Sequence, residues 1–194
     1  MPSQPRNETM ADDPDLAAVF EQTRALSEKE TLTPEEYQAI KHAVFGDVFQ
    51  GIVQAERSYF VLGRYDGGET EARLDAVKAH LNDRDGAFAY LMKDVPEAWE
   101  FWPTKFRILA ERADVIVPVL EDTDGSHEWE FGVVSGPAYR SKVHVLKREY
   151  PTEAAEHEHF DALPAQFVDV LDRDGRVHRW STESDLLAGI DALP

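Results

Sequence analysis

The apolar run Val115-Ile-Val-Pro-Val-Leu120 constrains the fold of this chain more than any other segment. Six consecutive apolar residues suit a strand that is covered on both faces, as the central strands of parallel sheets are. Similar but weaker segments alternate with helical stretches on either side of it, and strands are predicted at residues 59–63, 87–92, 114–120, 143–146, 167–171 and 177–180. This alternation indicates right-handed crossovers, and it therefore predicts an α/β fold with a parallel sheet of about five strands.

Local signals predict how several of these elements begin and end. Pro118 removes a hydrogen-bond donor from the central run, so a bulge or a strand end is expected close to it. Helices are predicted at residues 69–82, 96–112 and 128–139, the second with an interruption at Trp102-Pro103. A final helix is expected to be capped by Ser181 or Thr182.

The first third of the chain predicts a different organisation. We expect a disordered start over residues 1–12, a helical extension over 13–56 and the α/β domain over 57–194. Thr33-Pro34-Glu35-Glu36 has the pattern of a capping box at a helix start. The apolar residues that follow form a wide stripe, which must bury against the α/β domain or another subunit, so a homo-oligomer is expected. The stripe consists of Tyr37, Ile40, Val44, Phe45, Val48, Phe49 and Ile52.

The charge balance of the chain excludes some partners and suggests an environment. Its 38 acidic and 20 basic residues give a net charge of -18, and the acids are spread along the whole chain. Molar salt would screen the resulting self-repulsion, which favours a protein adapted to a salt-rich interior over an acidic protein of an ordinary cell. Without a Lys/Arg cluster, no binding to a nucleic acid duplex is expected. No apolar stretch indicates a membrane span or a secretion signal, so a cytoplasmic location without membrane contact is expected.

Two loops that follow predicted strands contain the candidate functional residues, because ligands of parallel sheets bind beyond the carboxyl ends of the strands. The first is Gly63-Arg64-Tyr65-Asp66-Gly67-Gly68, whose spacing matches neither a dinucleotide nor a P-loop motif, and no cofactor is expected. The second, residues 121–132, concentrates acidic side chains around a predicted helix start: Glu121, Asp122, Asp124, Glu128 and Glu130. These acids either favour the helix dipole or form a site in which Glu130, between Trp129 and Phe131, acts on a sugar. No metal is expected, since His157-Glu158-His159 cannot share one helical face.

The chain resembles the nucleoside 2-deoxyribosyltransferase family and its TIR-like relatives over residues 58–148. The resemblance is carried by Phe60-Val61-Leu62-Gly63-Arg64-Tyr65, by Ala113-Asp114 before the apolar run, by Asp124-Gly125 and by Glu130-Phe131-Gly132. It implies a flavodoxin-like sheet preceded here by the helical extension, and a nucleoside or nucleotide as the small-molecule partner.

The resemblance also implies roles for individual residues. Glu130 takes the place of the family's nucleophile, and Asp124 would orient the sugar or the nucleophile. The ligand-binding residues are then Gly63, Arg64, Tyr65, Asp122, Gly125 and Trp129. Where the family has an acid that protonates the leaving base, this chain has Lys105-Phe106. The resemblance therefore implies N-glycosidic cleavage or transfer, with a non-catalytic nucleotide-binding module and a TIR-like protein that cleaves NAD as alternatives.

Overall fold

A computed structural model describes most of the chain. The described residues are 16–19, 21, 24, 33–44, 46–95, 102–122, 127–152, 154–155, 159–160 and 162–194, and the side chains of 36, 41, 127–129 and 162–166 are not included. The chain divides into two compact units. The first comprises Met1–Ala55 and Met92–Leu109, and the second comprises Glu56–Leu91 and Ala110–Pro194. The domain boundaries expected from the sequence stay a prediction.

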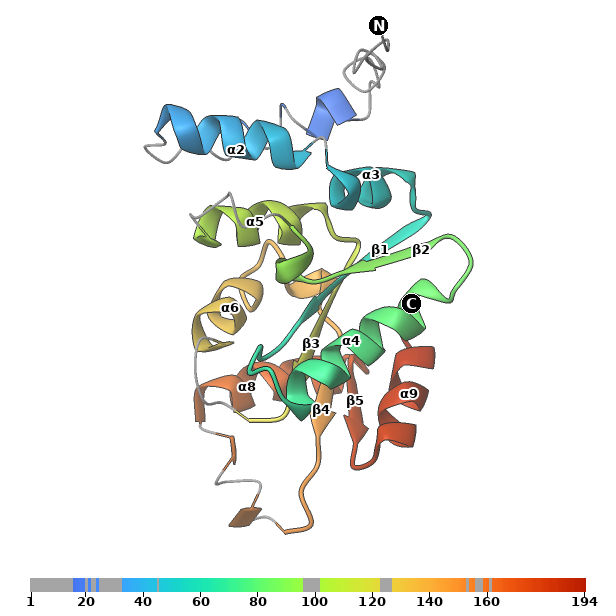
Figure 1. The fold of residues 1–194 in the computed structure, drawn as a ribbon. Helices are drawn as coiled ribbons and strands as arrows, with labels where there is room; N and C mark the ends of the chain where they lie inside the picture. The colour runs from blue at the N-terminus through green and yellow to red at the C-terminus, as the bar shows by residue number, and fades with distance from the viewer. Residues whose placement is uncertain are drawn as a thin grey trace, which may run out of the picture. The chain divides into compact units, whose positions relative to one another are not determined.

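The second unit contains a five-stranded sheet in the order β2-β1-β3-β4-β5 (Figure 1). Its strands are β1 (Arg57–Leu62), β2 (Ala87–Tyr90), β3 (Val115–Leu120), β4 (Val145–Arg148) and β5 (Val177–Trp180). All neighbouring pairs are parallel. The order and the parallel pairing are those of a flavodoxin-like fold, so the predicted fold class is confirmed.

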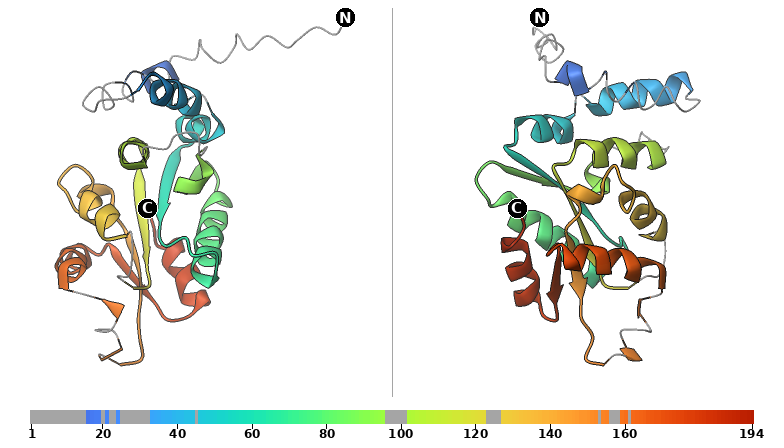
Figure 2. Two further views of the ribbon diagram at one scale, coloured as in Figure 1. Left: turned by 60° about the vertical axis from the view of Figure 1, so that its left-hand side comes forward. Right: turned by 180° about the vertical axis from the view of Figure 1, so that it is seen from behind.

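Helices cover both faces of this sheet (Figure 2, left). On one face lie α4 (Glu69–Asn82) and α9 (Glu183–Asp191), and on the other α6 (His127–Val134) and α8 (Ala162–Arg173). Because side chains alternate along a strand, the odd-numbered residues of β3 face α4 and α9, and the even-numbered ones face the opposite side. The core on the α4/α9 face includes Tyr59, Val61, Leu74, Val77, Leu81, Val115, Val117, Val119, Leu146, Trp180, Leu186 and Ile190.

Pro118 interrupts one ladder of the sheet without changing its register. It pairs with Leu62 of β1, and on the β4 side the pairing runs from an isolated bridge at Ile116 to a regular pair at Val119. The offset between partners is the same at both points, so there is neither the bulge nor the strand end that the sequence predicted. The N–H of His144 donates to the carbonyl of Ile116 at 2.9 Å, and residues two apart in a strand face the same neighbour. The missing donor of Pro118 therefore accounts for the gap in the ladder to β4.

The predicted strand at residues 167–171 is wrong. These residues lie inside α8, which runs from Ala162 to Arg173. Val168 and Leu171 are buried, whereas Val170 is exposed, which is a helical period and not a period of two. A short apolar run does not separate a strand from a buried helix face, and here the helical spacing decides.

Several boundaries also differ from the predicted ones. Of the helix predicted over 96–112, residues 96–101 lie outside the described residues, and α5 (Trp102–Arg112) has Pro103 in its first turn, where its missing N–H costs no helical hydrogen bond. α6 ends at Val134, and a short 3-10 helix, η2 (Arg140–Lys142), precedes β4. The predicted cap of the last helix is confirmed, because the Thr182 hydroxyl accepts from the N–H of Asp185 while the Asp185 carboxylate accepts from the N–H of Thr182.

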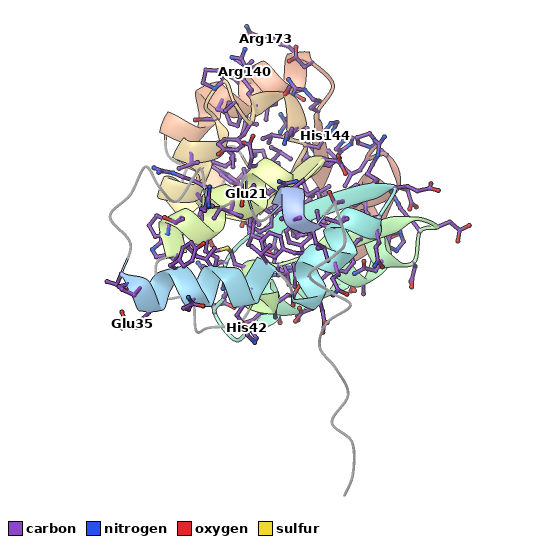
Figure 3. All side chains as sticks on the ribbon, turned by 90° about the horizontal axis from the view of Figure 1, so that it is seen from above. Glu21, Glu35, His42, Arg140, His144 and Arg173 are labelled. Carbon is purple, nitrogen blue, oxygen red and sulfur yellow. The ribbon has the colours of Figure 1, made fainter. Side chains whose placement is uncertain are left out.

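The first unit is helical in its described part. It contains α2 (Pro34–Val44), α3 (Asp47–Gln54), the 3-10 helix η1 (Met92–Asp94) and most of α5. The predicted single helix is divided at Gly46 into α2 and α3. Glu35 and His42 are exposed and project outward from α2 (Figure 3), while four residues of the predicted stripe are buried: Ile40, Val44, Phe49 and Ile52. Among the described residues, no helix is long and apolar enough to cross a membrane.

Candidate functional site

The carboxyl ends of β1 and β3 form the switch point of the sheet. These two strands are neighbours, but the chain leaves β1 towards β2 and leaves β3 towards β4, in opposite directions along the sheet. The loops that follow them therefore diverge, and ligands of open α/β sheets bind in the space between such loops. The candidate residues of the sequence follow β1 and β3, as this rule requires.

Gly63, the first residue after β1, is required by packing. A Cβ on Gly63 would lie 2.5 Å from a methyl carbon of Leu74, so only glycine lets α4 approach the end of β1 this closely. The resemblance implied that Gly63 is a ligand-binding residue, which stays a prediction. The structure shows that it admits a helix side chain.

The rest of this loop is closed by its own carboxylates. The N–H of Gly68 donates to Asp66 and the N–H of Gly67 donates to Glu71, both at 2.9 Å. The Gly68 N–H and the Arg64 guanidinium hold the pKa of Asp66 below its ordinary value, against the opposing effect of burial. These two backbone N–H groups are therefore already occupied by acidic side chains.

Arg64 connects the two candidate loops. Its Nη1 donates to Asp122 at 3.0 Å, and its Nη2 donates to Asp66 at 3.1 Å. Arg64 and Asp122, both predicted as ligand-binding residues, are thus brought together. Tyr65, the third predicted residue of the first loop, is 37% exposed.

Glu130 lines a hollow at the switch point together with Gly63. Glu130 is the fourth residue of α6, in the first turn as the sequence predicted. The hollow measures about 230 Å³, part of it open to solvent, around an inner space of about 10 Å³. Its other lining residues are Leu62, Pro118, Leu120 and Phe131. The even-numbered Pro118 and Leu120 place this hollow on the α6/α8 face of the sheet.

The remaining candidate residues are only partly described. Asp124 and Gly125 lie outside the described residues, and so does the side chain of Trp129, whose backbone belongs to α6. Lys105 is 7% exposed, and its Nζ donates to the carbonyl of Val95 at 2.8 Å. In the part of the chain that the structure describes, no three side chains of His, Asp or Glu come together in a group that could hold a metal ion.

Glu121 has a partner set that the sequence did not reveal. It follows β3 directly, is 6% exposed and accepts from two arginines. Arg73 of α4 donates through Nε and Nη2, each at 2.7 Å, and Arg148 at the end of β4 donates through Nη1 at 2.8 Å. The carboxylate of Glu121 raises the pKa of Arg73, mainly through these hydrogen bonds. We call Arg73, Glu121 and Arg148 the Glu121 cluster.

Aromatic rings surround the Glu121 cluster. The guanidinium carbon of Arg148 lies 5.3 Å from the ring centroids of both Tyr150 and Trp180, and that of Arg73 lies 5.9 Å from Trp180. The Tyr150 hydroxyl donates to the carbonyl of Glu121 at 2.6 Å, and burial raises the pKa of that hydroxyl. Arg148 and Trp180 are register partners in the sheet, so their side chains share the α4/α9 face. The cluster and the Glu130 hollow therefore both lie at the carboxyl ends of the strands, but on opposite faces of the sheet.

Comparison with known proteins gives a family and a distant structural likeness. The chain belongs to a family of unknown function, DUF8170, whose model matches residues 1–163. No curated protein matches the chain. Among solved structures, a conserved protein from Enterococcus faecalis V583 is similar, with a TM-score of 0.48 and 13% sequence identity over 71% of this chain and 98% of that chain. Glu130 and all three residues of the Glu121 cluster lie within the part that the family model matches.

Proposed function

We propose that this chain binds a nucleoside or nucleotide at the carboxyl ends of β1 and β3 and cleaves or transfers its N-glycosidic bond through Glu130. The supporting observation is that Glu130 and Gly63 line one hollow at the switch point of the sheet. The enclosed part of the hollow, about 10 Å³, holds roughly one water molecule, so a sugar would bind at its open mouth, beside Glu130.

The proposed reaction has two displacements at the anomeric carbon. A carboxylate oxygen of Glu130 forms a bond to this carbon, and the carbon–nitrogen bond breaks with its electron pair going to the base, which takes up a proton. Water or a nitrogen of a second base then attacks the same carbon and gives up a proton to solvent, and the bond from this carbon to the Glu130 oxygen breaks with its electrons returning to the carboxylate. Hydrolysis and transfer differ only in this second nucleophile, and both retain the configuration of the sugar.

One observation favours a second candidate, a nucleotide-binding module without catalysis. The base must be protonated as it leaves. Where the nucleoside 2-deoxyribosyltransferase family has an acid for this step, this chain has Lys105. The ammonium group of Lys105 is buried and donates to the carbonyl of Val95. One of the three N–H groups of Lys105 is thus directed to a backbone carbonyl, and no carboxylic acid stands at this place to protonate the leaving base.

The experiment compares Glu130→Gln with a matched control, Glu183→Gln, in molar KCl. Glu183 is the first residue of α9, so both variants remove a carboxylate from the first turn of a helix. Release of free base is measured by chromatography with nucleosides, nucleotides and NAD as substrates. We expect Glu130→Gln to abolish release and keep ligand affinity, since the amide retains the shape of the side chain but cannot attack carbon. Glu183→Gln should retain the activity of the wild type.

Two outcomes would decide against catalysis. If the wild type binds a nucleoside but releases no base, and Glu130→Gln binds it equally well, the binding module replaces the enzyme. If the two variants lose the same small amount of stability, at most ~1 kcal/mol, and nothing else changes, Glu130 only favours the helix dipole.

A further inference from the structure

The Glu121 cluster carries an excess of positive charge. Two guanidinium groups share one carboxylate, which gives the cluster a formal charge of +1. Among the described residues, one further acid contacts the cluster: Glu69 lies 3.5 Å from Nη1 of Arg73, and because its side chain is 93% exposed, water screens this ion pair. Acidic residues outnumber basic ones in this chain by 38 to 20, yet two arginines here bind the same acidic side chain. A second guanidinium is not needed to neutralise Glu121, which points to a role in binding an anion.

Arg148 presents unused donors from a fixed position. It donates to Glu121 through Nη1, and its Nε and Nη2 have no acceptor among the described residues. The side chain is 35% exposed, so these donors can be reached from solvent. The hydrogen bond to Glu121 and the rings of Tyr150 and Trp180 restrict its movement. A guanidinium edge held in this way is already organised to bind two oxygen atoms.

A further donor in the same place lacks an acceptor. Trp180 is 3% exposed, and its Nε1 is buried without a hydrogen-bond partner among the described residues. This nitrogen belongs to the ring that the guanidinium groups of Arg73 and Arg148 both flank. A buried N–H group is ordinarily paired, so a donor left open beside two arginines is a second indication of an anion.

The loop after β1 is not a competing anion site. Its glycine N–H groups at Gly67 and Gly68 are occupied by Glu71 and Asp66, and Arg64 donates to Asp66 and Asp122. Of these two places at the carboxyl ends of the strands, the one with open arginine donors is therefore Arg148, on the α4/α9 face.

We propose that Arg148 and Arg73 bind a phosphoryl oxyanion on the α4/α9 face of the sheet edge. A phosphoryl group offers three acceptor oxygens, enough for the Nε/Nη2 edge of Arg148 and one further donor, whereas a carboxylate offers two. The oxyanion comes from free phosphate or from the phosphate of a nucleotide. The site does not depend on the reaction proposed for Glu130, which lies on the other face.

In the test, inorganic phosphate is titrated into the full chain in KCl at constant ionic strength, and the heat of binding is measured by calorimetry. A titration with additional KCl in place of phosphate is the reference. The variants are Arg148→Gln, Arg148→Lys and the control Arg179→Gln. Arg179 is a good control because its exposure matches that of Arg148, it donates to one carboxylate, Asp172, and it lies at the end of β5. We expect saturable binding that weakens at least about tenfold in Arg148→Gln and is unchanged in Arg179→Gln. Arg148→Lys keeps the charge and the fold but loses the two-donor edge, so its affinity should also fall.

A nucleoside and its monophosphate distinguish the two sources of the phosphate. Equal affinity for phosphate and monophosphate would assign the site to free phosphate, and a much tighter monophosphate would assign it to a nucleotide. Both results support the proposal. No saturable binding of phosphate to the wild type, or equal affinities in Arg148→Gln and Arg179→Gln, would overturn it and leave the Glu121 cluster as a structural ion pair. Glu130→Gln should bind phosphate like the wild type, so failure of the proposed reaction is seen separately.

Discussion

Two acidic residues flank β3, and their surroundings are opposite. Asp114, directly before the strand, is exposed, and its Oδ2 accepts at 2.8 Å from both the N–H and the hydroxyl of Ser58. Glu121, directly after the strand, is buried and accepts from two arginines. Asp114 is thus solvated on one side with neutral donors on the other, whereas Glu121 has lost its water and gained two cations.

The difference shows how burial dictates the partners of a charge. Water stabilises an exposed carboxylate, so neutral donors are sufficient for Asp114. A buried carboxylate is costly unless a countercharge and several hydrogen bonds replace its hydration. Glu121 receives more countercharge than it needs, and the surplus is what makes the carboxyl edge of β3 a candidate site. At the amino end of β3, Asp114 accepts hydrogen bonds from Ser58 of the neighbouring strand β1, and this contact stabilises the sheet.

The largest effect is expected for Glu121→Gln. The amide would leave two partly buried guanidinium groups without a countercharge, so the free energy of unfolding should fall by ~2–4 kcal/mol, below the usual cost for a fully buried pair because both arginines keep contact with water. Urea denaturation at fixed KCl measures this. Glu149→Gln, a change of an exposed acid nearby, should stay within ~0.5 kcal/mol of the wild type. A loss for Glu121→Gln as small as that for Glu149→Gln would contradict the contrast between the two flanks of β3.

A smaller effect is expected on acidification, through His144 and His178. Their rings stack with centroids 6.1 Å apart, and both have a buried nitrogen without a partner among the described residues. Burial, with the nearby His178 and Arg176, lowers the pKa of His144 from 6.5 to about 4, and burial also lowers the pKa of His178. Because the folded values lie below the unfolded one, stability is fully present above pH 6.5 and is lost as the pH falls towards about 4.

The size of this loss is ~1–2 kcal/mol, since half-exposed rings are partly screened by solvent. His144→Phe keeps the ring and removes one titration, so its stability should fall less between neutral pH and the acid range than that of the wild type. Parallel pH profiles of the variant and the wild type would show that the acid sensitivity arises elsewhere.

The smallest effect is expected for the pair Ser58 and Asp114. A double-mutant cycle with Ser58→Ala and Asp114→Asn should give a coupling of ~1 kcal/mol, below the ~1.5–3 kcal/mol of a hydrogen bond to a charged group because Asp114 is exposed. This coupling should not change with KCl, because the Ser58 donors are neutral. The coupling of Glu121 with the partly exposed Arg148 should shrink as molar salt shortens the screening length to ~3 Å.

Stability of the wild type should rise with KCl because of the net charge of -18, so each variant is compared with it at the same salt concentration.

Most strands were predictable because their signals are local. The runs that became β1, β3 and β5 are apolar or alternating and are bounded by turn residues, and Val177–Trp180 matches its predicted range. The prediction at residues 167–171 was wrong because a short apolar segment fits either a strand or one face of a helix. The effect of Pro118 was also misjudged, because the position of a missing donor matters only once its neighbour strand is known.

The candidate site was predictable to a smaller extent. Topology alone directed attention to the loops after β1 and β3, and the structure brings together Gly63 with Glu130 and Arg64 with Asp122. Glu121 appeared in the sequence only as one of several acids near a helix start. Arg73 has no motif around it, and no local signal connects it with an acid 48 residues later.

The sequence by itself determined most of the strands and helices, residues 167–171 excepted, and that acidic loops follow the carboxyl ends of the strands, because apolar periodicity and turn chemistry act over a few residues. Only the tertiary structure decided what Leu120 and Glu121 meet on their two sides of the sheet: Leu120 lines the Glu130 hollow, and Glu121 is buried among Arg73, Arg148 and Trp180. These partners lie 48 and 27 residues from Glu121 in the chain. The contact with Arg148 exists because parallel pairing places the ends of β3 and β4 side by side, and the contact with Arg73 exists because α4 packs on the same face of the sheet; no local pattern records either.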